Sequence, residues 1–168
     1  MISKDVPRDL WFDDVVVGES FATRSRVISE ADIRAFCELT EDRHPLHTDA
    51  EYARSKGFPG VIAHGLFCLA LMEGLKTETG LYEHTSIASL GWNEVAFRCP
   101  VVAGDEVHVE FTFAAKRVSS KGDRGVVTET VRLVDRSGRV VVDASHAALV
   151  SMRGSPSRDQ STSTTGRQ

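Results

Sequence analysis

The sequence predicts a single α+β domain in which one long helix packs on a curved antiparallel sheet. Three observations support this prediction. The segment from Val61 to about Thr77 is apolar on nearly every side, which is typical of a buried helix. In residues 107–113, valine and phenylalanine alternate with polar residues, which is the period of a strand with one buried face. Two more β-branched segments, 126–134 and 140–150, follow with a turn between them, as in an antiparallel sheet.

The N-terminal part of the chain should contain a strand and then a helix. Residues 21–28 alternate loosely and are expected to form the strand. Ser29 is the expected N-cap of the helix, and Asp32 completes a variant of the capping box. We expect this helix to run to about Thr40, which leaves Asp42 just beyond its end.

The connection to the buried helix is expected to be mostly loop. Pro45 cannot continue a helix, and it biases His44 toward an extended conformation. Thr48 or Asp49 is expected to cap a short helix around Tyr52. Beyond the buried helix, residues 85–98 are extended in character and should add one more strand.

Length and composition fit one domain over residues 1–152. The chain has 168 residues, of which 41% are hydrophobic and 26% are charged, so it can bury a core of ordinary size. Residues 153–168 contain no aliphatic or aromatic side chain. We expect them to form a disordered C-terminal tail, because nothing there offsets the entropy lost on ordering.

Several classes of partner are not expected. The net charge is −4 and no basic run is present, which argues against nucleic acid. The longest apolar run, Val61–Leu75, would span only about 22 Å as a helix, short of the roughly 30 Å of a bilayer core. The N-terminus lacks the apolar segment of a signal peptide, and the three cysteines show no paired spacing. We therefore expect buried thiols in a cytoplasmic protein with no membrane partner.

The candidate chemistry lies in one short stretch and in the start of the buried helix. Asp42 and His47 flank Pro45, which places a carboxylate and an imidazole close enough to work as an acid/base pair. Taken alone, such a pair after a helix is more often a cap or a surface loop. The buried helix begins near Ala63-His64-Gly65, and its first N–H groups have no partner within the helix.

The chain resembles the MaoC-like dehydratases, the family of R-specific enoyl-CoA hydratases, over roughly residues 8–150. The signature of that family is Asp-x-Asn-Pro-x-His, and Asp42, Pro45 and His47 match it, while His44 stands where asparagine is usual. Further matches are Trp11-Phe12-Asp13-Asp14 with Gly18, the segment Gly60 to Leu66, and Pro100 to Asp105. The resemblance implies a hot-dog fold, a homodimer, and catalysis by Asp42 and His47 on an acyl thioester of CoA or of acyl carrier protein.

The residues suit addition of water to a 2-enoyl thioester, with an (R)-3-hydroxyacyl product implied by the resemblance. Asp42 and His47 would hold and activate one water molecule. Backbone N–H groups at His64 and Gly65 would stabilise the developing enolate oxygen, and Gly65 would let that oxygen approach closely. The chemistry requires no metal or redox cofactor, with the CoA thioester acting only as substrate. A His-x-x-His pair in a proline-containing loop is also not a specific zinc pattern.

The roles of other residues near the expected site are less clearly indicated by the sequence. We expect His44 to be tolerated and to shape substrate choice, because a histidine cannot donate and accept as an amide does in the same volume. Tyr52 and Phe58 are candidates for the acyl pocket, although core packing explains them equally well. His64 is more readily explained as a locally hydrogen-bonded residue at the helix start than as a catalyst. His146 lies on the same strand face as its apolar neighbours, which favours a satisfied core or interface histidine.

Two other functions stay open on the same fold. An acyl-CoA thioesterase would need a carboxylate that activates water at the carbonyl carbon. A non-catalytic acyl-CoA-binding subunit of a heteromeric dehydratase would bind a thioester without hydrating it. The intact pair of Asp42 and His47 argues against this second alternative.

Overall fold

The computed structural model describes residues 2–3, 5–120 and 122–154. One six-stranded antiparallel sheet has the order β1–β4–β5–β6–β3, with β2 also pairing with β4. The helices are η1 (Phe12–Asp14), α1 (Glu30–Thr40), α2 (Pro45–Thr48), α3 (Ala50–Ser55) and α4 (Gly65–Glu78). The strands are β1 (Ser20–Ala22), β2 (Arg26–Val27), β3 (Ser86–Phe97), β4 (Glu106–Val118), β5 (Arg124–Asp135) and β6 (Val140–Ser151).

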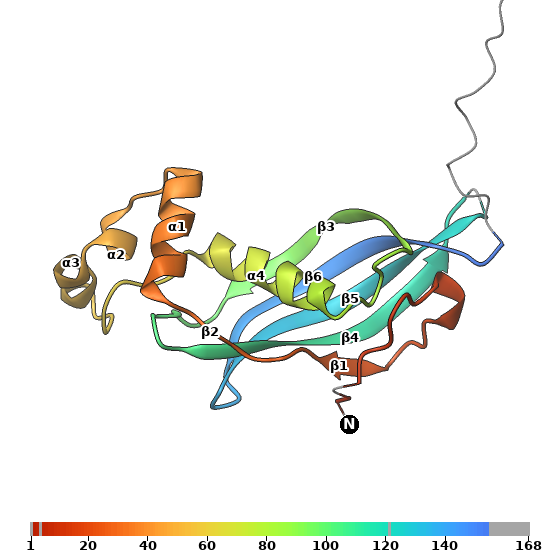
Figure 1. The fold of residues 1–168 in the computed structure, drawn as a ribbon, viewed down its shortest axis with the longest axis horizontal. Helices are drawn as coiled ribbons and strands as arrows, with labels where there is room; N and C mark the ends of the chain where they lie inside the picture. Colours follow the sequence, from red (N-terminus) through yellow and green to blue (C-terminus); the bar gives the residue numbers. More distant parts are fainter. Residues whose placement is uncertain (1, 4, 121, 155–168) are drawn as a thin grey trace, which may run out of the picture.

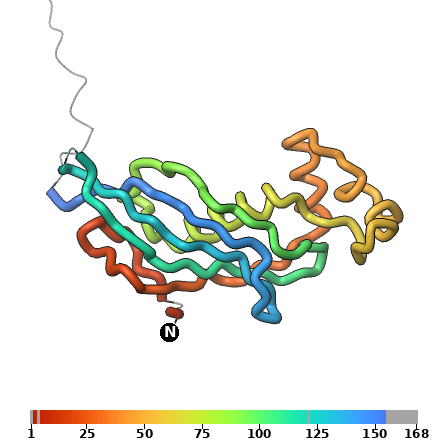
Figure 2. The backbone as a smooth tube through the Cα atoms, turned by 180° about the vertical axis from the view of Figure 1, so that it is seen from behind, coloured from red at the N-terminus to blue at the C-terminus, as the bar shows by residue number. Residues whose placement is uncertain are grey.

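The predicted α+β architecture is confirmed. Helix α4 lies lengthwise over one face of the sheet, and α1, α2 and α3 form an extension at one end of it (Figure 1). The view from behind shows the same extension projecting beyond the strands (Figure 2). The N-terminal half of α4 therefore lies between the sheet and this extension. Residues 155–168 of the predicted tail lie outside the described residues, while the backbone N–H of Arg153 donates to Asp13 at 2.8 Å.

The start of α1 is as the sequence predicts. Ser29 is the N-cap, its hydroxyl accepts from the backbone N–H of Asp32 at 3.1 Å, and the Asp32 carboxylate accepts from the Ser29 N–H at 2.8 Å. Beyond Thr40, Glu41 takes the left-handed conformation, with φ at 63°. This turn ends the helix and directs Asp42 back toward α4.

The connection after α1 is more helical than expected. Pro45 does not lie in a loop but occupies the first position of α2, where its missing N–H costs nothing. His44 caps this short helix, because its Nδ1 accepts from the backbone N–H of Leu46 at 3.3 Å. Asp49 caps α3 as predicted, with its carboxylate accepting from the N–H groups of Glu51 and Tyr52 at 2.8 and 3.0 Å.

The buried helix begins at Gly65, within the start expected near Ala63-His64-Gly65, because the Ile62 and Ala63 N–H groups donate to carbonyl groups of neighbouring segments at 3.0 and 2.7 Å. The expectation that it is buried on nearly every side is corrected, since it is covered on one face only. Cys68, Leu71, Met72, Leu75 and Lys76 are buried, while Leu66 is 65% exposed. In a single chain, the sheet leaves the opposite face of α4 to solvent.

A buried ionic cluster fixes α4 to the sheet at its C-terminal half. Glu129 on β5 and His146 on β6 face each other in register and are 0% and 2% exposed. Lys76 reaches them from α4, ion-paired with Glu129 and 3.0 Å from the Nδ1 of His146. The Tyr82 hydroxyl donates to Glu129 at 3.2 Å, and His146 Nε2 lies 2.8 Å from the Ser89 hydroxyl. His146 is therefore the satisfied core histidine that the strand pattern favours.

Replacing Lys76 with methionine should destabilise the fold strongly. Removing one partner of a buried ion pair typically costs about 3–5 kcal/mol, because the other charge stays buried alone. Urea unfolding would measure this loss. Lys56→Met, at an exposed lysine whose ammonium lies over the Tyr52 ring, is the matched control and should change the free energy of unfolding by no more than about 1 kcal/mol. Equal destabilisation by the two variants would contradict this assignment.

Candidate active site

A cavity of about 600 Å³ opens at the N-terminal end of α4. It lies where α1 and the α2 connection meet α4 and the end of β3. Of the predicted site residues, it brings together Asp42, His47, Phe58, His64 and Gly65. The remaining lining residues are mostly apolar: Phe36, Thr40, Ile62, Ala63, Leu66, Cys68, Phe97, Arg98, Cys99, Pro100, Val101 and Val142.

Asp42 presents its carboxylate to this cavity from the turn after α1. Its Oδ1 accepts from the backbone N–H of His44 at 3.2 Å, which orients the group. The side chain is 55% exposed, and its Oδ2 lies 3.9 Å from the Nε2 of His64. One side-chain atom each of Asp42, His47 and His64 lies within 4.8 Å of the others. The predicted carboxylate and imidazole therefore meet.

The tautomer of His47 follows from its backbone partner. Its Nδ1 lies 2.7 Å from the carbonyl oxygen of Ile62. Because a carbonyl only accepts, Nδ1 carries the proton and Nε2 keeps its lone pair. Partial burial lowers the pKa of His47, an effect that the Ile62 hydrogen bond opposes and the neighbouring His64 reinforces. His47 is thus set up as a neutral proton acceptor at physiological pH.

His64 braces the two other groups. Its ring is buried and stacks on the His47 ring, with 3.6 Å between centroids and 23° between planes. Its Nε2 donates to the main-chain carbonyl of Asp42 at 3.0 Å. His64 is also the N-cap residue of α4, although its side chain makes no cap hydrogen bond. His64 was expected to form hydrogen bonds close to the helix start. In the structure it contacts both candidate catalytic residues, through the stacked ring of His47 and the main-chain carbonyl of Asp42.

Gly65 was expected to leave room for a substrate oxygen, but in the structure the space beside it holds the ring of Phe97. A side chain at this position would meet the Phe97 ring at 2.8 Å, so the space that the glycine leaves open holds an aromatic ring from the end of β3. Phe97 is itself 52% exposed. The first N–H groups of α4 still point toward the cavity end of the helix, as they do in any α-helix.

The three residues predicted to shape the substrate separate in space. Phe58 lines the cavity. His44 and Tyr52 do not line it, and their rings pack edge to face with 6.0 Å between centroids. The His44 ring lies 6.3 Å from that of His47, so it neighbours this candidate catalytic histidine from outside the cavity. A role of His44 or Tyr52 in substrate choice stays a prediction.

The proximity of Asp42, His47 and His64 raises the question of a metal ion. Histidine nitrogens bind metals through lone pairs that lie in the ring plane. Two nearly parallel rings 3.6 Å apart cannot both point their lone pairs at one ion between them. His47 Nδ1 and His64 Nε2 also already donate to carbonyl groups. This geometry fits a proton-transfer site better than a metal site.

Comparison with known proteins identifies the family. A family model described as a MaoC like domain matches residues 14–134. The chain belongs to the MaoC-like dehydratase family. The (R)-specific enoyl-CoA hydratase of Aeromonas caviae is 34% identical over 72% of this chain and 85% of its own length. This MaoC-like chain is therefore an enzyme of the hydratase and dehydratase kind.

Solved structures agree with this assignment. The MaoC-like dehydratase of Rhodospirillum rubrum superimposes with a TM-score of 0.77 at 31% identity, covering 86% of this chain and 98% of its own. A Mycobacterium tuberculosis protein described as a double hot-dog fold gives a TM-score of 0.76 at 23% identity, covering 88% of this chain and 46% of its own. The latter shows the fold alone, and the predicted hot-dog architecture is confirmed.

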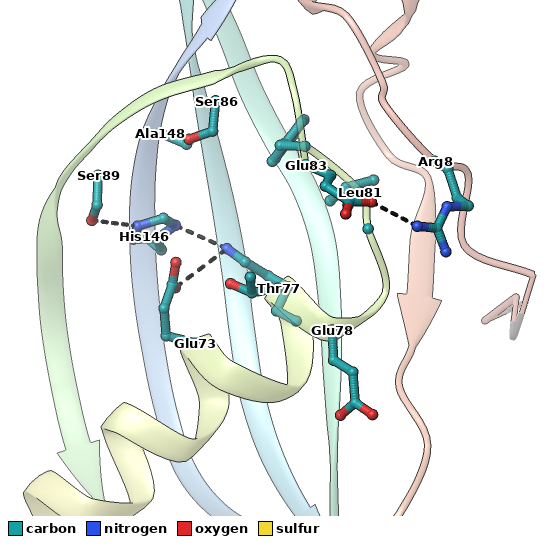
Figure 3. A pocket seen from close by; sticks show the side chains of 13 residues that line it. Arg8, Glu73, Thr77, Glu78, Leu81, Glu83, Ser86, Ser89, His146 and Ala148 are labelled. Carbon is teal, nitrogen blue, oxygen red and sulfur yellow. Dashed lines mark hydrogen bonds and ion pairs between the residues drawn. The ribbon is translucent and has the colours of Figure 1, made fainter.

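A second cavity, of about 390 Å³, lies at the opposite end of α4. Lys76, Ser89 and His146 of the buried ionic cluster line it. Figure 3 shows the contact between His146 and Ser89. Sequence reasoning did not identify Glu129 or Lys76. The sequence did hold a signal for Glu129. It lies two residues from Val127 and from Val131, so the period of a strand places it on their buried face of β5.

We expect the pKa of His47 to lie below the ordinary histidine value of 6.5, because burial disfavours its charged form. Its ring should carry the proton on Nδ1 throughout the neutral range. Nitrogen-15 NMR of the imidazole would report both the midpoint and the tautomer, with His47→Asn assigning the signal. A midpoint above 6.5, or a proton on Nε2 in the neutral ring, would contradict the geometry.

Proposed function

We propose that this MaoC-like enzyme catalyses the reversible hydration of a trans-2-enoyl thioester to an (R)-3-hydroxyacyl thioester. The observation that carries the proposal is the meeting of Asp42 and His47 in one cavity at the N-terminal end of α4. The stereochemistry is taken from the named activity of the Aeromonas caviae relative. The predicted roles of both residues are part of this proposal.

The reaction follows from the orientation of the groups. A water molecule is held between the Asp42 carboxylate and the Nε2 lone pair of His47, which takes a proton as the water oxygen bonds to C3. The π electrons of the C2–C3 bond move toward the thioester carbonyl, forming an enolate. Asp42 orients the water and helps return a proton to C2. Water is thereby added across the double bond, and the two side chains end as they began.

Stabilisation of the enolate oxygen is assigned to the start of α4. The unpaired N–H groups near Gly65 carry the positive end of the helix dipole. A single oxyanion donor is worth about 10²–10³-fold in rate in other enzymes. The proposed chemistry needs no metal or redox cofactor, since proton transfer and fixed dipoles supply each step.

The substrate is proposed to be an acyl thioester of CoA or of acyl carrier protein. The lining of the cavity is largely apolar, which suits an acyl group. Acyl chain length, the role in fatty-acid metabolism and the cytoplasmic location stay predictions. The thioesterase and the non-catalytic subunit remain the alternatives: release of free CoA would indicate the first, and binding without turnover the second.

A homodimer is proposed as the working unit. Strand β3 ends the sheet order, so one of its edges has no neighbouring strand among the described residues. Leu90 on this strand and Leu66 on α4 are 51% and 65% exposed. A second copy would cover an open strand edge and these apolar side chains, and the mass in solution would test this.

Asp42→Asn and His47→Ala should each lower the rate of hydration by about 10²–10⁴-fold, because each removes one group of the proton-transfer pair. Loss of the conjugated enoyl absorbance measures the reaction. His84→Ala, at an exposed histidine outside the cavity, is the control and should retain the wild-type rate. Wild-type activity in either site variant would contradict the assignment of Asp42 and His47 as the acid/base pair.

His44→Asn restores the residue that is usual in the family signature. Because His44 lies against His47 and Tyr52, we expect the variant to change relative rates among short, long and branched enoyl thioesters. The ratio of kcat/KM values between these substrates is the measurement. An unchanged rate and substrate profile would rule out a role of His44 in specificity.

A further inference from the structure

The catalytic cavity has one cationic side chain among its described lining residues, Arg98. This arginine follows directly after β3 and was not singled out by sequence analysis. Asp42 is the only carboxylate on the same lining. A thioester of CoA or of a carrier protein carries negative charge outside its acyl group, so the surroundings of this arginine bear on how such a substrate is held.

The backbone of Arg98 is fixed while its guanidinium is free to bind. The backbone N–H donates to the carbonyl of Val141 on β6 at 2.8 Å, and Pro100 stiffens the chain two residues later. The preceding residue, Phe97, packs over Gly65 and so ties this segment to the first turn of α4. The side chain of Arg98 is 59% exposed. Arg98 therefore belongs to the cavity lining at the end of β3, and its solvent-exposed guanidinium extends toward Asp143 on β6.

The charge of Arg98 is only partly offset. Its guanidinium lies 3.8 Å from Asp143, beyond hydrogen-bonding distance. The same carboxylate also faces Arg132, at 3.4 Å. One carboxylate shared between two guanidinium groups leaves a net positive charge at this place. The planar N–H donors of an arginine are suited to bidentate binding of a phosphate.

We propose that Arg98 forms a phosphate subsite for the 4′-phosphate of the pantetheine arm that CoA and acyl carrier protein have in common. The inference rests on the proposed function and extends it to recognition of the carrier. A pocket of this size holds a drug-sized ligand. The acyl group and part of the pantetheine arm would therefore fill the apolar interior. The phosphate at the end of the arm would lie outside the interior and bind the exposed guanidinium of Arg98.

The test compares three thioesters of the same short enoyl group: with CoA, with 4′-phosphopantetheine and with unphosphorylated pantetheine. Arg98→Ala should raise KM about 10- to 100-fold for the first two, because it removes charge-assisted hydrogen bonds, and should leave kcat unchanged. KM for the pantetheine thioester should be the same in the variant and the wild type. Arg98→Lys, which keeps the charge without the bidentate geometry, should recover part of the loss.

Arg136→Ala is the matched control, because Arg136 is an exposed arginine that neither contacts Asp143 nor lines the cavity. It should leave KM for all three thioesters unchanged. An equal rise with unphosphorylated pantetheine, or no rise at all, would overturn the proposal. A rise confined to the CoA thioester would place the recognised phosphate on the nucleotide, and this result would also overturn the proposal.

The proposed function and this subsite fail in distinguishable ways. If the wild-type protein hydrates none of the three thioesters, the hydratase proposal fails, and calorimetric binding of CoA and of pantetheine still tests Arg98. Weaker binding of CoA to Arg98→Ala, with binding of pantetheine unaltered, would support the phosphate subsite on its own. Binding of CoA with wild-type affinity by Arg98→Ala would exclude it. Unfolding curves of the variants check that each is folded.

Discussion

The hydrogen bond from His64 to the main-chain carbonyl of Asp42 holds the candidate active site together. It joins the residue that precedes α4 to the turn that follows α1, two segments 22 residues apart. The same imidazole stacks on His47, so one side chain sets the positions of both groups proposed to act on water. Because Nε2 donates to that carbonyl, it carries a proton, and the hydrogen bond holds the ring face on which His47 stacks in place.

Much of this arrangement follows from local sequence. The Ser29 capping box, the alternation in β4 and the turn before β6 are short-range signals, and the structure has each of them where the sequence places it. Helix α4 starts near Ala63-His64-Gly65 as expected and not at Val61, where the apolar segment begins, because hydrogen bonds from Ile62 and Ala63 to distant carbonyls outweigh helix propensity there. Helix α2 was missed because Pro45 was weighed as a helix breaker rather than as a first residue.

The sequence predicts which residues form the candidate site, but it does not predict the contacts between them. Asp42 and His47 stand in a recognisable order, but the stacking of His47 on His64 depends on how α2 meets α4. Arg98 gave no local signal, since only the sheet brings the end of β3 to the start of α4. The buried charges of Lys76 and Glu129 could not be predicted from hydrophobic patterning, which expects apolar residues at buried positions. Burial alone would raise the pKa of Glu129, but the neighbouring Lys76 and His146 outweigh this effect and lower that pKa below its ordinary value.

The contact between Gly65 and Phe97 couples two positions that are 32 residues apart. Any larger residue at position 65 would displace the aromatic ring, and with it the segment that carries the arginine of the cavity lining. Relatives that replace this glycine should therefore carry a smaller residue in place of Phe97. The volume of the entrance would then vary through paired substitutions, while the acid/base residues stay constant.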